Sequence, residues 1–114
     1  QKGMSLAQNT MLADVRDASV VVVNPTHYAV ALKWSRAAPG APVCVAKGLD
    51  AVALRIREAA EDAAVPVRRD APTARALYAT VEVGDEIGPE LYAPVAAAIR
   101  FAEEVRARAR RSVL

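Results

Sequence analysis

Residues 19–34 read SVVVVNPTHYAVALKW, and this stretch carries the strongest structural pattern of the chain. Its four consecutive valines, residues 20–23, form a β-branched run that is typical of a strand buried on both faces. Asn24 and Pro25 follow, and such a pair opens turns because the residue before proline is biased toward extended backbone. Residues 29–34 predict a second strand. The connection between the two strands is short enough for a hairpin.

The bond between Asn24 and Pro25 also permits an unusual backbone reaction. Deamidation of asparagine begins with attack by the N–H of the next residue, and proline has no N–H. The side-chain amide nitrogen of Asn24 can instead attack its own main-chain carbonyl, close a succinimide and expel the proline nitrogen. This reaction is slow in a free chain, but orienting an intramolecular nucleophile is worth roughly 7–11 kcal/mol, so a fold that holds the amide in place can accelerate it. An ordinary turn is the alternative interpretation.

The candidate catalytic residues are therefore Asn24, Pro25, Thr26 and His27. Asn24 supplies both the nucleophile and the electrophilic carbonyl, and Pro25 supplies the leaving nitrogen. Thr26 and His27 are expected to fix the turn by hydrogen bonds. Histidine side chains titrate near neutrality, so His27 is a candidate for proton transfer or simply for holding the loop.

The remaining sequence predicts helices around a small sheet. Residues 5–16 predict an N-terminal helix with a weak apolar stripe, loosely attached and with a frayed terminus. Residues 42–46 predict a third strand, and residues 65–67 a short strand at an edge because of its proline. Three further helices are predicted: one capped by Asp50 and running to residue 63, one beginning at Asp70 or Thr73, and a last one with Pro89 in its first turn. Spacing in the last helix places its apolar residues on one stripe, which consists of Leu91, Val95, Ile99, Ala102 and Val105. This alternation indicates an α/β domain.

Composition limits the classes of function. The chain has 114 residues, a net charge of +2, and 54% hydrophobic but only 4% aromatic residues. A single cysteine and a single histidine form no zinc-ligand pattern, so we expect no metal and no cofactor. Cys44 lies in an apolar segment, where a free thiol usually acts as a small buried hydrophobe. No stretch is long and apolar enough to span a membrane.

Two alternatives stay open at the level of the residues. One is a small α/β enzyme that uses His27 with Lys47 or Cys44. The other is a basic membrane-surface or nucleic-acid binding module that acts through its last arginines, although a net charge of +2 is low for that role. These arginines are also expected in a solvated helix end, where they complement the helix dipole; they are Arg100, Arg106, Arg108, Arg110 and Arg111. Lys47, Arg55, Arg57, Asp85 and Glu86 are expected to be solvated charges or surface contacts.

Several blocks of the sequence resemble one family in order. The valine strand with NPTH resembles the signature of the FlhB/YscU family, the autocleaved substrate-specificity switch proteins of flagellar and type III export machines. Tyr28 and the Ala-Val-Ala-Leu after it resemble the flagellar FlhB branch more than the injectisome branch. Further matching blocks are residues 45–50, 53–58, 74–78, 81–84 and 91–92.

The resemblance implies a specific organisation. Residues 1–18 would be a linker helix from a preceding membrane domain, residues 19–110 the autocleaving cytoplasmic α/β domain, and residues 111–114 a flexible tail. The fold would be a small mixed β-sheet of about four strands covered by helices. The chain would be the cytoplasmic domain of a bacterial inner-membrane protein that cuts itself once and acts on no external substrate. Its partners would be other export-apparatus proteins, exported substrates and a hook- or needle-length control protein, with no nucleic acid, and its two pieces would stay associated.

Overall fold

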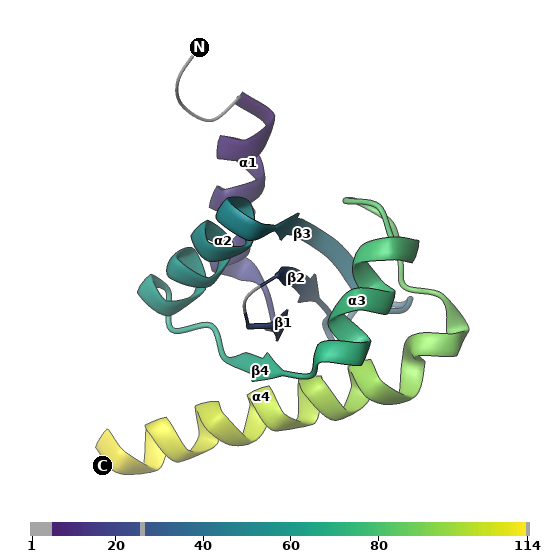
Figure 1. The fold of residues 1–114 in the computed structure, drawn as a ribbon. Helices are drawn as coiled ribbons and strands as arrows, with labels where there is room; N and C mark the ends of the chain where they lie inside the picture. The colour runs from purple at the N-terminus through teal and green to yellow at the C-terminus, as the bar shows by residue number, and fades with distance from the viewer. Residues whose placement is uncertain (1–5, 26, 114) are drawn as a thin grey trace.

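The structure is a computed structural model and describes residues 6–25 and 27–113. Within these residues, helices cover a small central sheet (Figure 1). The elements in chain order are α1 (Leu6–Asp14), the 3-10 turn η1 (Val15–Asp17), β1 (Val20–Asn24), β2 (Tyr28–Lys33), β3 (Val43–Leu49), α2 (Asp50–Asp62), β4 (Val67–Arg69), α3 (Ala71–Thr80), the 3-10 turn η2 (Pro89–Leu91) and α4 (Tyr92–Val113).

The four strands form one mixed sheet in the order β3-β2-β1-β4. β1 and β2 make an antiparallel hairpin, and β2 also pairs antiparallel with β3. The chain then crosses through α2, and β4 pairs parallel with β1. The predicted fold class, a small mixed sheet of about four strands covered by helices, is confirmed. The strand order, which local sequence left open, follows from this crossover.

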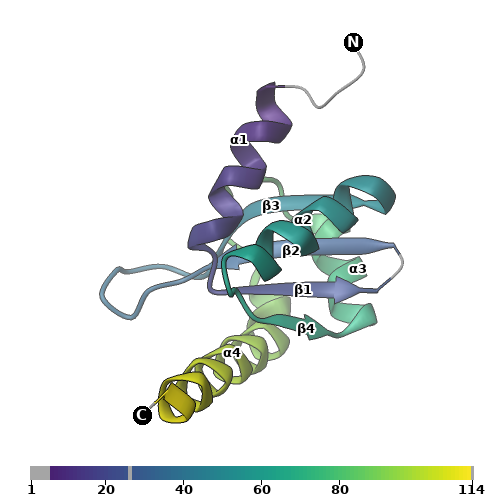
Figure 2. The same cartoon turned by 90° about the vertical axis from the view of Figure 1, so that its left-hand side faces the viewer.

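β1 is buried on both faces because helices lie on both sides of the sheet (Figures 1 and 2). Val20 and Val22 belong to the core under α3 and α4, whereas Val21 and Val23 belong to the core under η1 and α2. All four valines are at most 2% exposed. Successive side chains of a strand point to opposite faces, so a strand between two cores requires an unbroken apolar run.

The third strand is longer than the sequence predicts, since it ends at Leu49 and not at Ala46. Gly48 permits the close packing that follows, because a Cβ there would overlap the side chain of Val52 on α2. The prediction that Asp50 caps α2 is wrong. Asp50 is the first residue of the helix, Leu49 occupies the capping position, and Leu49 makes no side-chain capping bond. Asp50 has a φ of 50°, in the left-handed region that lets the chain turn sharply out of β3.

β4 is the edge strand next to β1 and begins two residues later than predicted. Pro66 lies just before it, where its missing N–H removes no ladder bond, and its carbonyl accepts the Val21 N–H at 3.0 Å. The predicted start of α3 is confirmed, since the Asp70 side chain caps that helix by accepting the Thr73 N–H at 3.3 Å.

α4 packs along the sheet through the predicted apolar stripe, which comprises Leu91, Val95, Ile99, Ala102 and the half-buried Val105. Pro89 opens η2 just before it. Arg106 donates to the carbonyls of Ser19 at 2.8 Å and Ala18 at 3.3 Å, so this arginine fastens α4 to the start of β1. The helix continues through Val113 and thus includes residues 111–113, which the sequence analysis assigned to a tail.

α1 extends away from the body of the domain (Figure 2) and contains no buried residue. Met11 and Leu12, both half-buried, pack against the core near η1. The expected loose attachment therefore agrees with the structure, whereas the expected fraying concerns residues outside the described ones. In the described part of the chain, no helix combines the length and the apolar character that crossing a bilayer requires.

Candidate functional site

The Asn24-Pro25 bond lies at the tip of the β1-β2 hairpin. Asn24 is the last residue of β1 and is paired with Tyr28, the first residue of β2, so three residues form the loop between them. Asn24 and Pro25 are half-buried. Thr26, one of the predicted site residues, lies outside the described residues. The other three predicted site residues, Asn24, Pro25 and His27, are brought together in this one turn.

The main-chain carbonyl of Asn24 has a main-chain donor. The N–H of His27 donates to the Asn24 oxygen at 2.9 Å, which closes the tight turn. The preceding carbonyl, that of Val23, accepts the N–H of Asp70 at 3.0 Å. The peptide planes before and at the Asn24-Pro25 bond are therefore both fixed by hydrogen bonds from within the fold.

Helix α2 holds the other side of the turn. The N–H of Asp50, at the start of α2, donates to the His27 carbonyl at 2.9 Å. Two turns further along the same helix, Arg57 Nη1 donates to the Pro25 carbonyl oxygen at 2.5 Å. The prediction that Arg57 is a solvated charge is wrong, because its guanidinium binds the carbonyl of Pro25. Arg57 is distant from Pro25 in the sequence and belongs to a mixed-charge helix face, so no local pattern marked it.

The His27 ring, in contrast, points into solvent. Its side chain is 63% exposed, and Nδ1 lies 3.9 Å from a carboxylate oxygen of Asp50, which is 69% exposed. Exposed ion pairs of this kind contribute roughly 0–1 kcal/mol. The backbone N–H of His27 thus binds the Asn24 carbonyl, whereas the His27 ring lies near the carboxylate of Asp50 on α2.

A hollow of about 430 Å³ opens beside the turn. Its lining combines the turn with β3, α2 and α3, and consists of Asn24, His27, Tyr28, Leu49, Asp50 and Arg75. Water therefore has access to Asn24, which any hydrolysis at that residue requires.

The alternative enzyme site does not assemble around His27. Lys47 donates to the Tyr78 carbonyl at 3.0 Å, lies 4.8 Å from the centroid of the Tyr78 ring and is 3.5 Å from a Glu82 carboxylate oxygen. It joins β3 to α3 and is not the solvated charge that the sequence analysis expected. Cys44 is fully buried in the core, as expected, and burial raises the pKa of its thiol to about 11. A neutral, enclosed thiol is a poor nucleophile.

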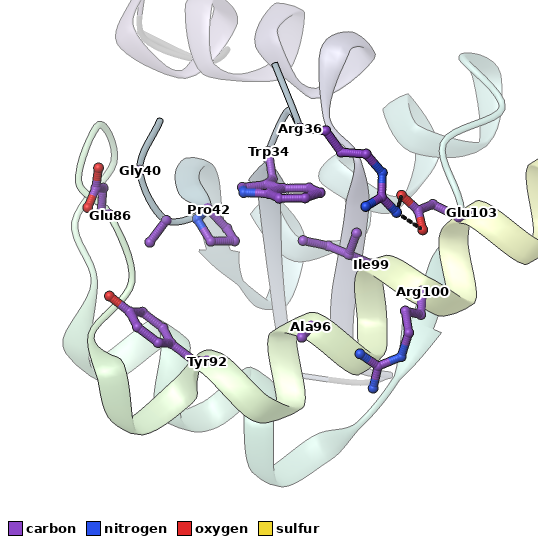
Figure 3. A pocket seen from close by; sticks show the side chains of 11 residues that line it. Trp34, Arg36, Gly40, Pro42, Glu86, Tyr92, Ala96, Ile99, Arg100 and Glu103 are labelled. Carbon is purple, nitrogen blue, oxygen red and sulfur yellow. Dashed lines mark hydrogen bonds and ion pairs between the residues drawn. The ribbon is translucent and has the colours of Figure 1, made fainter. Parts of the chain in front are cut away.

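A second concave site lies at the other end of β2, between the β2-β3 loop and α4 (Figure 3). Its cavity volume is about 620 Å³. Trp34 and Ile99 face into it (Figure 3). Arg36 closes one end, because its Nη2 donates to both carboxylate oxygens of Glu103 at 2.9 and 3.0 Å. We call this site the Trp34 groove; its other lining residues are Gly40, Ala41, Pro42, Glu86, Tyr92, Ala96 and Arg100.

Fold and hairpin together define a class of protein: a mixed α/β domain that presents an Asn-Pro turn at the end of a buried central strand. A sequence model of the FlhB HrpN YscU SpaS Family matches residues 1–102. The chain belongs to this family, as its sequence resemblance implied.

Individual relatives agree with this assignment. Flagellar biosynthetic protein FlhB of Aquifex aeolicus is 49% identical over 96 residues, which are 84% of this chain and 27% of that protein. The crystal structure of the cytoplasmic domain of FlhB from Shewanella putrefaciens has a TM-score of 0.85 at 37% identity, covering 90% of this chain and 79% of that one. A form of the EscU C-terminal domain with an asparagine replaced by aspartate has a TM-score of 0.79 at 31% identity, covering 90% and 95%. The chain thus spans about a quarter of the length of its full-length FlhB relatives.

Proposed function

We propose that this chain is the cytoplasmic domain of a flagellar or type III export protein that cuts itself once between Asn24 and Pro25. The observation that carries the proposal is the fixation of the turn: the carbonyls of Val23, Asn24, Pro25 and His27 each accept a hydrogen bond from within the domain. An intramolecular reaction between the side-chain amide and the main-chain carbonyl of Asn24 requires that the backbone of the turn be held in place.

The reaction forms one bond and breaks one. The Asn24 side-chain nitrogen attacks the Asn24 main-chain carbon, the bond from that carbon to the Pro25 nitrogen breaks, and a proton passes from the amide to the departing nitrogen. As the tetrahedral intermediate forms, negative charge develops on the Asn24 oxygen, where the His27 N–H already lies at 2.9 Å. Donors at this distance from a developing oxyanion are an effective form of electrostatic stabilisation.

The products are a succinimide at the end of residues 1–24 and a free amine on Pro25. Water from the adjoining hollow then opens the succinimide. In this proposal the backbone N–H of His27 stabilises the oxyanion. The exposed His27 ring is a secondary candidate for transferring the proton. The domain turns over once and has no external substrate.

The biological setting belongs to the same proposal. Residues 1–18 connect to a membrane domain in the bacterial inner membrane, and the cut accompanies a switch in the class of exported substrate. Other export-apparatus proteins, exported substrates and a hook- or needle-length control protein are the partners. What supports this setting is membership of the family and the likeness to cytoplasmic domains of FlhB and EscU.

The test of self-cleavage is the mass of the purified chain after denaturation. We expect two pieces, residues 1–24 and 25–114, in place of one 12.1 kDa chain. Cyclisation further predicts that freshly cut residues 1–24 are lighter by one water than the same peptide ending in a free carboxyl group, and that this difference disappears with time. A chain that stays intact through long incubation at neutral and alkaline pH contradicts the proposal.

The Trp34 groove is a second candidate site, favoured by its own shape and lining. Its floor is apolar, whereas its ends carry Arg36 paired with Glu103 and the separate charge of Arg100. Apolar pockets with a few placed polar groups are the usual form of ligand sites. We infer that this groove takes an apolar side chain from an extended segment of an exported substrate, a partner class that the family resemblance implies.

A charge in the groove tests this inference. Ala96→Glu places a carboxylate beside Ile99 and Trp34, and we expect roughly tenfold weaker binding of an exported substrate because the charge must be desolvated on docking. Ala93→Glu, at an exposed position on the same helix and outside the groove, is the matched control. Binding is measured by calorimetry with a purified exported substrate. Equal affinity for the two variants excludes the groove as the docking site.

A further inference from the structure

The side chain of Arg57 binds a main-chain carbonyl and not a carboxylate. It lies on α2 near several carboxylates of the same helix, yet in the described part of the chain it forms no ion pair. Its guanidinium instead donates to the carbonyl oxygen of Pro25, 32 residues earlier in the chain. Ordering a long, rotamer-rich side chain onto one neutral carbonyl costs conformational entropy. The contact is therefore a specific interaction between α2 and the hairpin.

The contact acts together with the start of α2. The Asp50 N–H binds the His27 carbonyl, and Arg57 binds the Pro25 carbonyl, so one rigid helix fixes the chain on both sides of residue 26. Once the Pro25 carbonyl is held, the pyrrolidine ring has little freedom, because proline already restricts its own φ. The orientation of the leaving nitrogen relative to the Asn24 carbonyl is thereby set from α2.

We propose that Arg57 is a positioning residue for the cleavage at Asn24-Pro25. This inference rests on the proposed self-cleavage and assigns it a residue outside the NPTH turn. Arg57 touches the Pro25 oxygen and neither of the atoms whose bond breaks, so it acts by fixing the orientation of the leaving group. After the cut, the same hydrogen bond retains the new N-terminal residue against α2.

The experiment measures the rate at which newly synthesised intact chain converts to two pieces, by mass spectrometry after cell-free synthesis. Arg57→Leu and Arg57→Gln are expected to cleave roughly tenfold to a hundredfold more slowly, the cost of losing a charge-assisted hydrogen bond or of a small misplacement. Arg57→Lys keeps a cationic donor and is expected to recover a large part of the rate. Arg55→Leu, an exposed neighbour on the same helix, is expected to cleave like the unchanged chain.

The melting temperature shows whether a change at Arg57 affects folding as well as positioning. It is measured for each Arg57 variant with Asn24→Ala added, so that every chain is intact. We expect Arg57→Gln and Arg57→Lys to melt alike while their cleavage rates differ. An Arg57→Gln chain that cleaves as fast as the unchanged chain overturns the inference and leaves self-cleavage intact. Equal rates for Gln and Lys overturn it as well, because a merely structural loss would not respond to the restored cation. An unchanged chain that never cleaves refutes the proposed function itself, and the role of Arg57 with it.

Discussion

Replacement of Asn24 by alanine is expected to leave a single 12.1 kDa chain under denaturing conditions, with no detectable cleavage. The variant lacks the amide nitrogen that attacks the main-chain carbonyl, whereas the carbonyl, the His27 N–H and Pro25 are all still present. The fold should survive, because Asn24 is half-buried at the tip of the hairpin and contributes to neither core. Mass spectrometry and circular dichroism of the same sample measure the two properties.

Two further variants sharpen this prediction. Asn24→Asp keeps the shape of the side chain and removes only the nucleophilic nitrogen, so it is also expected to stay intact near neutral pH. Asn9→Ala changes the other asparagine of the chain, on exposed α1, and is expected to cleave normally. Cleavage of Asn24→Ala at the same bond would show that water, and not the asparagine side chain, attacks the carbonyl.

The second large effect concerns the cut protein, which is expected to remain one particle in gel filtration under native conditions. β1 keeps five residue pairs with β2 and three with β4 after its end is cut. Its four buried valines each contribute roughly 1.5–3 kcal/mol, and the total is an upper estimate because the unfolded chain buries part of this surface. Residues 1–24 should therefore separate from residues 25–114 only in denaturant.

Val22→Asp tests the source of this association. The carboxylate would lie unpaired in the core under α3 and α4, a change that costs about 3–5 kcal/mol. We expect the variant to lose residues 1–24 after cleavage or to fail to fold, as gel filtration and circular dichroism report. Val22→Ala, which shortens the side chain without adding a charge, is the milder control and should retain both pieces. Spontaneous separation of the pieces in the unchanged protein would show that β1 is held less firmly than its burial implies.

Much of the architecture could be predicted from local pattern. The valine run predicted a strand buried on both faces, and the start of α3 was predicted at Asp70 or Thr73, of which Asp70 is the cap. The apolar spacing from Leu91 to Val105 predicted the face by which the last helix packs. These predictions succeed because periodicity and capping are decided by neighbours in the sequence. The cap assigned to Asp50 fails because Gly48 draws α2 close to β3 and the chain turns at Asp50 itself.

For the site, the sequence by itself determined the reactive pair. Asn24 and Pro25 are adjacent, and their capacity for cyclisation is a covalent property of the dipeptide; their role in cleavage stays a prediction. What the tertiary structure decided is how the turn is held. Arg57 reaches Pro25, and Asp70 reaches Val23, because the crossover through α2 brings β4 beside β1. Hydrogen bonds between residues this far apart depend on strand order and helix packing, which no local pattern encodes, and so only the folded chain revealed how the Asn24-Pro25 turn is restrained.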